Sequence, residues 1–380
     1  MRSFRIALII LTLVTLSIAQ ETPTISVNVK VVNVLATVRD KHGNIVNTLT
    51  KDDFTLDDDG HPQAIRYFAR ETDMPLSLGL LVDTSISQVQ ALDKERVASA
   101  GFTNELLREG KDTAFLIHFD REVELLQDLT SSRQKIATAI DELQAPRYDD
   151  QRNTGSSGGG NSGGGRGRHG GGFGGGTLLY DSIFLASDEV LQKQQGRKAL
   201  VVLTDGVDHG SKMSIERAIE SAQRADTIVY SIYFAGREGG DYRGGSGGPW
   251  GGGRRGGGWP GGGGGYPGGG YPGGGGGYPG GGRGQPGTSS EDGKKILQRL
   301  SQETGGRMFV VSKKEPIDQI YKKIEDELRN QYNLGYSPDR TGDNSSDYHH
   351  IHVTTKQKDL VVQAREGYYA SRQVDAKQGN

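Results

Sequence analysis

Five side chains that carry oxygen atoms lie just after apolar or glycine-rich runs of the sequence, and together they suit the binding of one metal ion. Asp83, Ser85 and Ser87 alternate in "LGLLVDTSISQ", Thr177 follows the glycines of "GGFGGG", and Asp205 lies in "LTDG". Two carboxylates and three hydroxyls are ligands that a hard divalent cation prefers. The set predicts a site for Mg²⁺, with Mn²⁺ or Ca²⁺ as alternatives. Because only two of the five ligands carry charge, the bound ion would stay electron-poor and would accept a further acidic ligand.

Apolar strands and amphipathic helices alternate through the centre of the chain and would position these residues. The apolar runs are "LSLGLLV", "TAFLIHF", "KALVVLT", "TIVYSIYF" and "RMFVV". Helical patterns between and after them cover residues 89–108, 131–143, 178–194, 214–225, 290–304 and 315–332. This alternation predicts a doubly wound, mostly parallel α/β sheet covered on both faces, with "REVELLQDLT" as an antiparallel edge strand. In such sheets ligands bind beyond the carboxyl ends of the strands, which is where all five side chains fall.

At these residues the sequence resembles a known family. "DTSIS", Thr177 in "GGTLLYDSI" and "LTDG" are similar to the metal-ion-dependent adhesion site of von Willebrand factor type A domains. The wider pattern resembles the secreted von Willebrand A-related family of acidobacteria over most of the mature chain. The resemblance implies that Asp83 and Asp205 hold the metal directly or through water, that Ser85 and Ser87 ligate it, and that Thr177 joins when ligand is bound. A glutamate or aspartate of a partner protein would then take the sixth position. Ile86 stands where many such domains have glycine.

The organisation around this central domain follows from changes in composition. Residues 1–19 have two arginines before an uncharged run and small residues before a cleavage position after Ala19, which predicts a signal peptide and a secreted or periplasmic protein. The run is too short to span a bilayer, so no transmembrane span is expected in the mature chain. Residues 24–72 and 331–372 are rich in strand patterns, and we expect them to pack together as one β-sandwich beside a von Willebrand A domain at 76–330.

Two glycine-rich inserts interrupt the central domain, at residues 155–176 and 236–287. They hold 45 of the 60 glycines, and both leave the edge that carries the five side chains. The second insert repeats "YPGGG", and its glycine and proline content predicts disorder. Arginine and aromatic residues in the inserts suit self-association or binding to an anionic polymer or polysaccharide. A specific nucleic-acid partner is not expected of an exported chain, and a tolerated loop insertion explains the inserts equally well.

Three further features of the sequence bear on other kinds of chemistry. In "DYHHIHVTT" the strand period puts His350 and His352 on one face, opposite His349, and two imidazoles there could share a zinc ion, although an exposed strand face also explains them. The acidic run Asp57 to Asp59 could be imagined as a calcium loop, but turn chemistry accounts for it. A haloacid-dehalogenase phosphatase would need a second acidic residue where Ser85 stands, and the 380-residue chain has no cysteine nucleophile and no convincing serine–histidine pair.

The leading interpretation is an exported, non-enzymatic module that binds an acidic residue of a partner protein through a divalent cation. A structural protein that self-associates through its Gly/Tyr/Arg-rich tracts, with a metal site that only stabilises, is the alternative. A metal-assisted hydrolase ranks third. The formal net charge of −2 argues against a general polyanion binder.

Overall fold

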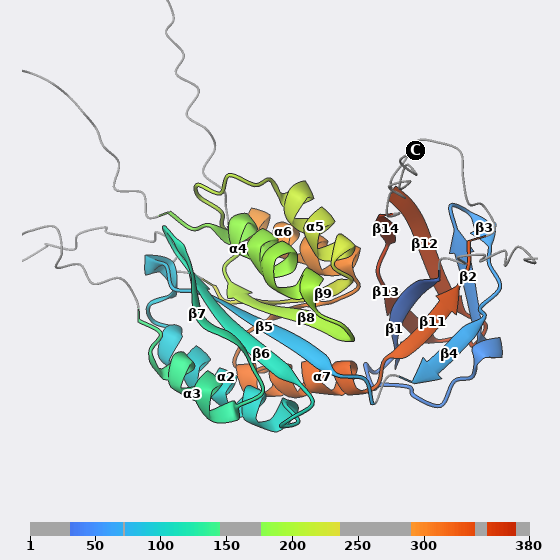
Figure 1. Cartoon of the computed structure of the whole chain (residues 1–380), viewed down its shortest axis with the longest axis horizontal. Coiled ribbons are helices and arrows are strands. Elements are labelled where there is room, and N and C mark those ends of the chain that lie inside the picture. The colour runs from blue at the N-terminus through green and yellow to red at the C-terminus, as the bar shows by residue number, and fades with distance from the viewer. Residues whose placement is uncertain (1–30, 71–72, 145–175, 236–289, 339–347, 370–380) are drawn as a thin grey trace, which may run out of the picture.

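The computed structural model describes residues 31–70, 73–144, 176–235, 290–338 and 348–369. They form an α/β unit and, beside it, a smaller all-β unit built from both ends of the chain (Figure 1). The predicted signal peptide, the second glycine-rich insert and all of the first except Gly176 lie outside the described residues. No helix among the described residues is long and apolar enough to cross a membrane.

A six-stranded sheet forms the centre of the α/β unit, in the order β10-β9-β8-β5-β6-β7. Its parallel strands are β5 (Leu76–Asp83), β6 (Thr113–Phe119), β8 (Arg197–Thr204), β9 (Thr227–Tyr233) and β10 (Met308–Val310). The edge strand β7 (Val123–Thr130) pairs antiparallel with β6. Every residue of β5, β8 and β9 is buried, as expected for strands covered on both faces.

Three helices cover each face of this sheet (Figure 1). One layer comprises α2 (Leu92–Leu106), α3 (Arg133–Asp141) and α7 (Ile317–Arg329), and the other comprises α4 (Leu179–Leu185), α5 (Ile215–Arg224) and α6 (Ser290–Thr304). Alternate side chains of β5 serve the two layers, because Leu78, Leu80 and Val82 pack in the first core and Leu81 in the second. The predicted helix 178–194 is not uniform, since α4 continues as a π-turn (Ala186–Val190) and a 3₁₀-turn (Leu191–Lys193).

The all-β unit consists of two four-stranded sheets. The first has the order β13-β1-β11-β4, with β13 (Leu360–Ala364), β1 (Val32–Asp40), β11 (Tyr332–Tyr336) and β4 (Tyr67–Arg70). The second has the order β14-β12-β2-β3, with β14 (Gly367–Tyr369), β12 (Tyr348–Thr355), β2 (Phe54–Asp58) and β3 (His61–Pro62). Their inner faces share one apolar core drawn from both chain ends. The predicted fold class, an α/β sheet with a sandwich of N- and C-terminal strands, is therefore confirmed; the exact domain boundaries stay a prediction.

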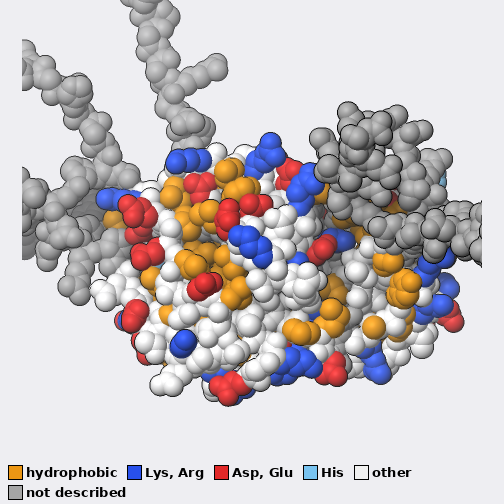
Figure 2. Space-filling view, viewed as in Figure 1, with side chains coloured by type: hydrophobic (Ala, Val, Ile, Leu, Met, Phe, Trp, Pro, Cys, Tyr) orange, Lys and Arg blue, Asp and Glu red, His pale blue; other side chains and the backbone are white. Residues whose placement is uncertain are grey.

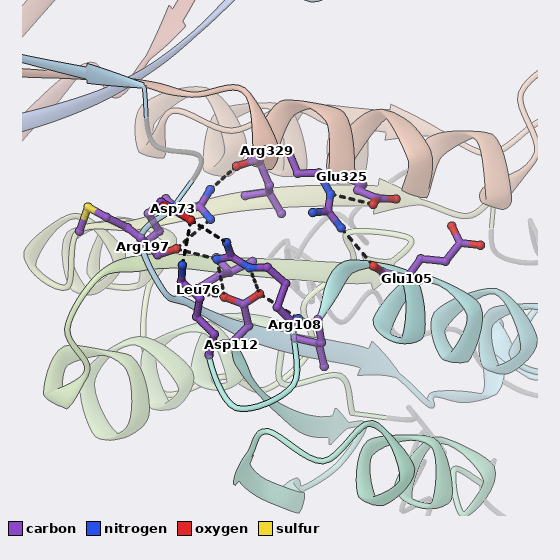
Figure 3. Close-up of polar contacts among 12 residues, drawn as sticks. Asp73, Leu76, Glu105, Arg108, Asp112, Arg197, Glu325 and Arg329 are labelled. Carbon is purple, nitrogen blue, oxygen red and sulfur yellow. Dashed lines mark hydrogen bonds and ion pairs between the residues drawn. The ribbon is translucent and has the colours of Figure 1, made fainter.

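A polar network fixes the point where the chain crosses from one unit to the other (Figure 3). Asp112 accepts a hydrogen bond from the backbone of Leu76 at 2.9 Å and forms an ion pair with Arg108 at 2.8 Å. Arg197 donates to the backbone carbonyls of Met74 and Leu328, so it ties the entry into β5 to the end of α7. These contacts lie at the amino ends of β5 and β8 and leave the carboxyl ends free for a site.

Candidate metal centre

The centre of the candidate site is the place where two neighbouring parallel strands end. Strand β5 finishes at Asp83 and β8 at Thr204, and the two strands are paired up to Val82 and Leu203. The Thr204 hydroxyl donates to Asp83 Oδ2 at 2.6 Å, and the backbone N–H of Ser85 donates to Asp83 Oδ1 at 2.9 Å. Asp83 is fully buried, so both oxygens depend on partners inside the protein.

The two serines lie in the turn that follows Asp83. Residues Ile86–Gln88 form a 3₁₀-turn, and the hydroxyls of Ser85 and Ser87 are 3.0 Å apart. Ser85 is buried and Ser87 is half-buried, so the pair extends from the base of the site toward solvent. Ile86 does not have a positive φ, and the glycine common at this position is therefore not required by the turn.

A close approach between two glycines holds the Asp205 loop. Gly206 has φ +76°, and a Cβ added there would lie 2.4 Å from the carbonyl oxygen of Gly293 in the first turn of α6. A Cβ on Gly293 would lie 2.2 Å from the carbonyl oxygen of Asp205. The carboxylate of Asp205 accepts the backbone N–H of Val207 at 3.1 Å. Two facing backbones without side chains thus fix where Asp205 leaves β8.

Thr177 reaches the same edge by a separate route. Its backbone N–H donates to the carbonyl of His209 at 3.0 Å, and its own carbonyl accepts the His209 N–H at 2.8 Å. The next residue, Leu178, donates to the carbonyl of Asp120, directly after β6. The structure therefore links Asp83, Ser85 and Ser87 by hydrogen bonds. It places Asp205 directly after β8 and buries Thr177 in the loop that meets both β6 and the Asp205 segment.

The electrostatics of the site favour a bound cation. Burial raises the pKa of Asp83 to about 7, and the charge of Asp205 adds to the rise, while the donors Ser85 and Thr204 oppose it. Within the described part of the chain, no lysine, arginine or histidine forms an ion pair with Asp83 or Asp205. Two carboxylates without a protein counter-charge would be stabilised by a divalent ion.

A third carboxylate lies near this site and was missed by the sequence analysis. Glu95, in the first turn of α2, is 1% exposed, and neither carboxylate oxygen has a hydrogen-bond partner among the described residues. Burial raises the pKa of Glu95 to about 8, with a further contribution from Asp83. The sequence does indicate that Glu95 is buried, because helical spacing places it on the same buried face of α2 as Leu92, Ser99 and Phe102. The structural donor Thr204 was missed too, although it directly precedes Asp205.

The histidines of strand β12 lie in the sandwich, away from this site. His350 and His352 are both exposed on one face, as the strand period predicts, whereas His349 points to the other face and contacts Asp59. Among the described residues, the group of acidic and histidine side chains close enough to share a metal contains His349 and neither of the other two.

Comparisons with known proteins give structural likeness only. No family model and no curated protein matches the chain. An aerotolerance-related membrane protein from Bacteroides fragilis is 15% identical, with 67% of this chain and 98% of that chain covered and a TM-score of 0.40. Proximal thread matrix protein 1 from the mussel byssus, with a zinc-occupied MIDAS motif, is 12% identical, and the match covers 72% of this chain but 50% of that one, with a TM-score of 0.41. The vWF domain of the pilus tip protein Mfa5 from Porphyromonas gingivalis is 14% identical, with 36% and 39% covered and a TM-score of 0.26.

Scores of this size carry no weight alone, and the chain's own topology defines its class. Five parallel strands with one antiparallel edge strand lie between two helical layers, and the "DTSIS" and "LTDG" segments follow adjacent central strands. The α/β unit has the von Willebrand factor A-type fold.

Proposed function

We propose that the α/β unit binds one divalent cation at the carboxyl edge of its sheet and uses that ion to capture an acidic side chain of a partner protein. Asp83 and Asp205 would supply charge, directly or through water, Ser85 and Ser87 would ligate through their hydroxyls, and Thr177 would join on ligand binding. Mg²⁺ is the preferred ion, with Mn²⁺ or Ca²⁺ as alternatives, because all five donors are oxygens. The chain would act outside the cytoplasm and without catalysis.

The observation that carries this proposal is the burial of Asp83 beside Asp205, with no cationic side chain of the described residues paired to either carboxylate. Hydrogen bonds from Thr204 and Ser85 satisfy Asp83 in part but leave its charge uncompensated. A site built only for stability would gain from an arginine or from an apolar residue at this position. A divalent ion bound by both carboxylates would instead offset their mutual repulsion, because each carboxylate is attracted to the ion.

The surroundings of the serine turn suit contact with a protein. Ile86 and Val89 flank Ser87 and expose 40% and 43% of their surface, so two large apolar side chains adjoin the proposed metal. Large apolar side chains that are exposed in the free protein are the type that becomes buried in the core of a protein interface. Figure 2 shows basic side chains interspersed with acidic and hydrophobic ones on the face in view, without a field of one sign that would favour a polyanion.

Calorimetric titration with Mg²⁺ tests the metal site. One ion per chain is expected, and Asp83→Ala or Asp205→Ala should reduce affinity by more than the roughly 10- to 100-fold that loss of an outer-shell partner costs. Ser211→Ala is the matched control, because the Ser211 hydroxyl bonds Asp208 at the same edge and is assigned no ligand role. Equal Mg²⁺ binding by wild type and the Asp83 variant would refute the assignment.

Partner capture needs a separate test. The wild-type chain should retain a protein from envelope extract in Mg²⁺ and release it in chelator, and the Asp83→Ala variant should retain none. If the partner protein is still retained in chelator and by the Asp83→Ala variant, its binding does not use the metal.

The alternative of self-association is favoured by where the second insert begins and ends. Strand β9 ends at Tyr233, and α6 begins at Ser290 with its first turn against the Asp205 loop, so the described residues on both sides of the second insert lie at the edge that holds Asp205. If the tracts alone join copies of the chain, Asp83→Ala should leave self-association unchanged in light scattering, and deletion of residues 239–286 should remove it.

A further inference from the structure

A second group of potential metal ligands lies in the sandwich, at the carboxyl end of β2. Asp58, Asp59 and His349 each offer one ligand atom, and the three atoms lie within 4.8 Å of one another. Nδ1 of His349 is 2.9 Å from Asp59 Oδ2 and 3.6 Å from Asp58 Oδ1. The two aspartates come from the N-terminal strands and the histidine from β12, so the cluster joins distant parts of the sequence.

Asp58 is buried and presents one unpartnered oxygen to this cluster. Its exposed fraction is 6%, and Oδ2 accepts the hydroxyls of Tyr336 at 2.8 Å and Tyr368 at 3.2 Å. Oδ1 is buried and has no hydrogen-bond partner among the described residues. A carboxylate oriented by two donors on one oxygen, with the other oxygen unpartnered, is the arrangement that outer-shell groups give a metal ligand.

The backbone orients Asp59 toward the same point. Asp59 has φ +50°, and its N–H donates to the carbonyl of His350 at 2.9 Å. The N–H of His350 donates back to Asp59 Oδ1 at 2.9 Å, which leaves Oδ2 to face His349.

The two distances from His349 Nδ1 match the separations between ligands of one ion. Ligands bound about 2.0–2.2 Å from one zinc ion lie about 2.8–3.6 Å from each other, from octahedral to tetrahedral angles. The distances from His349 Nδ1, 2.9 Å and 3.6 Å, span that range. Asp59 is exposed and His349 is half-buried, so the cluster is not sealed inside the sandwich core.

We propose that Asp58 Oδ1, Asp59 Oδ2 and His349 Nδ1 form a binding site for a divalent transition metal of the zinc class. One imidazole and two carboxylates suit zinc, whereas the all-oxygen set at Asp83 suits magnesium. The ion would fasten β2 and its turn to β12, and hence the N-terminal strands to the C-terminal strands.

A simple ion pair explains the same residues less completely. The single N–H on Nδ1 of a protonated His349 is directed at Asp59, and Asp58 Oδ1 at 3.6 Å is beyond hydrogen-bond reach. That arrangement leaves a buried carboxylate oxygen without a hydrogen-bond partner among the described residues, which is unfavourable. A metal ion satisfies all three atoms at once.

The test uses zinc and a chain in which the first site is removed. Asp83→Ala should bind one Zn²⁺ in competition with a chromophoric chelator, and adding His349→Gln or Asp59→Asn should weaken that binding at least 10-fold. His350→Gln and His352→Gln are matched controls on the same strand and should change it little. Co²⁺ should give visible absorption bands that disappear with His349→Gln.

Two outcomes would overturn the proposal, and neither depends on the magnesium site. The first is an Asp83→Ala chain that binds no Zn²⁺ although its circular dichroism spectrum and melting match wild type. The second is unchanged Zn²⁺ affinity in Asp83→Ala/His349→Gln. Asp59→Asn guards against a folding artefact, since asparagine tolerates the positive φ and keeps the side-chain shape.

Discussion

The hydroxyl of Thr204 donates a 2.6 Å hydrogen bond to Asp83 Oδ2, across the ends of two adjacent parallel strands. The same Thr204 oxygen accepts the N–H of Gly206 at 3.1 Å, so one side chain joins Asp83 to the loop that carries Asp205. Its role is to position two proposed ligands, with no ligand role of its own.

Thr204→Val should therefore weaken Mg²⁺ binding by about 10- to 100-fold, as loss of an outer-shell partner does. It should also lower the free energy of unfolding by about 1.5–3 kcal/mol, the contribution of a hydrogen bond to a charged group. Calorimetry and denaturant titration measure the two effects. Thr204→Ser keeps the hydroxyl and should restore both, and a Val variant that binds Mg²⁺ normally would contradict the positioning role.

The metal-free protein should lose stability as pH rises from 5 to 8. Burial raises the pKa of Asp83 to about 7 and of Glu95 to about 8, above unfolded values of about 4, so the folded state binds more protons in this interval. The stabilisation that comes from protonated Asp83 and Glu95 is complete below about pH 4 and is lost as the pH rises through their two folded-state pKa values. Melting temperatures measured in chelator from pH 5 to 8 test this expected loss of stability.

Glu95→Gln should flatten that pH dependence by removing one of the two groups with a raised pKa, whereas Glu105→Gln, at an exposed position of the same helix, should leave it unchanged. Mg²⁺ should flatten the dependence too, because the ion competes with the proton on Asp83. A melting temperature that rises from pH 5 to 8 in chelator would show that neither carboxyl is protonated in the fold.

Gly206→Ala should destabilise the fold and reduce Mg²⁺ affinity together. The added methyl would lie 2.4 Å from the carbonyl oxygen of Gly293, so the Asp205 loop or α6 must move. Gly110→Ala is a matched control, with φ +75° against +76° and nothing within 4 Å of the added Cβ. It should cost only the roughly 1–2 kcal/mol of a left-handed residue and leave Mg²⁺ binding intact. Equal effects of the two changes would mean that the glycine contact does not place Asp205.

Removal of residues 331–380 should unfold the N-terminal strands. Strand β11 lies between β1 and β4, and β12 pairs with β2, so the truncated chain would expose β1 and β2 along their lengths. Limited proteolysis and hydrogen exchange of residues 31–70 measure the loss. Unchanged protection of that segment would show that the two ends fold independently.

Much of this fold follows from short-range patterns that a sequence displays directly. Runs such as "KALVVLT" predict fully buried strands, and the placement of Asp83 and Asp205 after two of them predicts a shared edge. Glu95 was not foreseen, because helical spacing places it on the buried stripe without revealing that the stripe ends beside Asp83. The partner of His349 was not foreseen either, since it depends on the register that pairs Ile351 with Asp58 across 292 intervening positions. Register over such separations is set by packing and turn geometry, which local periodicity does not encode.

The sandwich also orders the events by which the chain reaches its native state. Strand β1 finds its neighbours β11 and β13 only after the entire α/β unit has been made, because that unit lies between them in the sequence. A folded α/β unit brings residues 73 and 331 close together and shortens the effective loop that the sandwich must close. Assembly of the α/β unit should therefore precede closure of the sandwich. During synthesis β1 and β2 must wait for the strands β11, β12 and β13, which lie between residues 332 and 364.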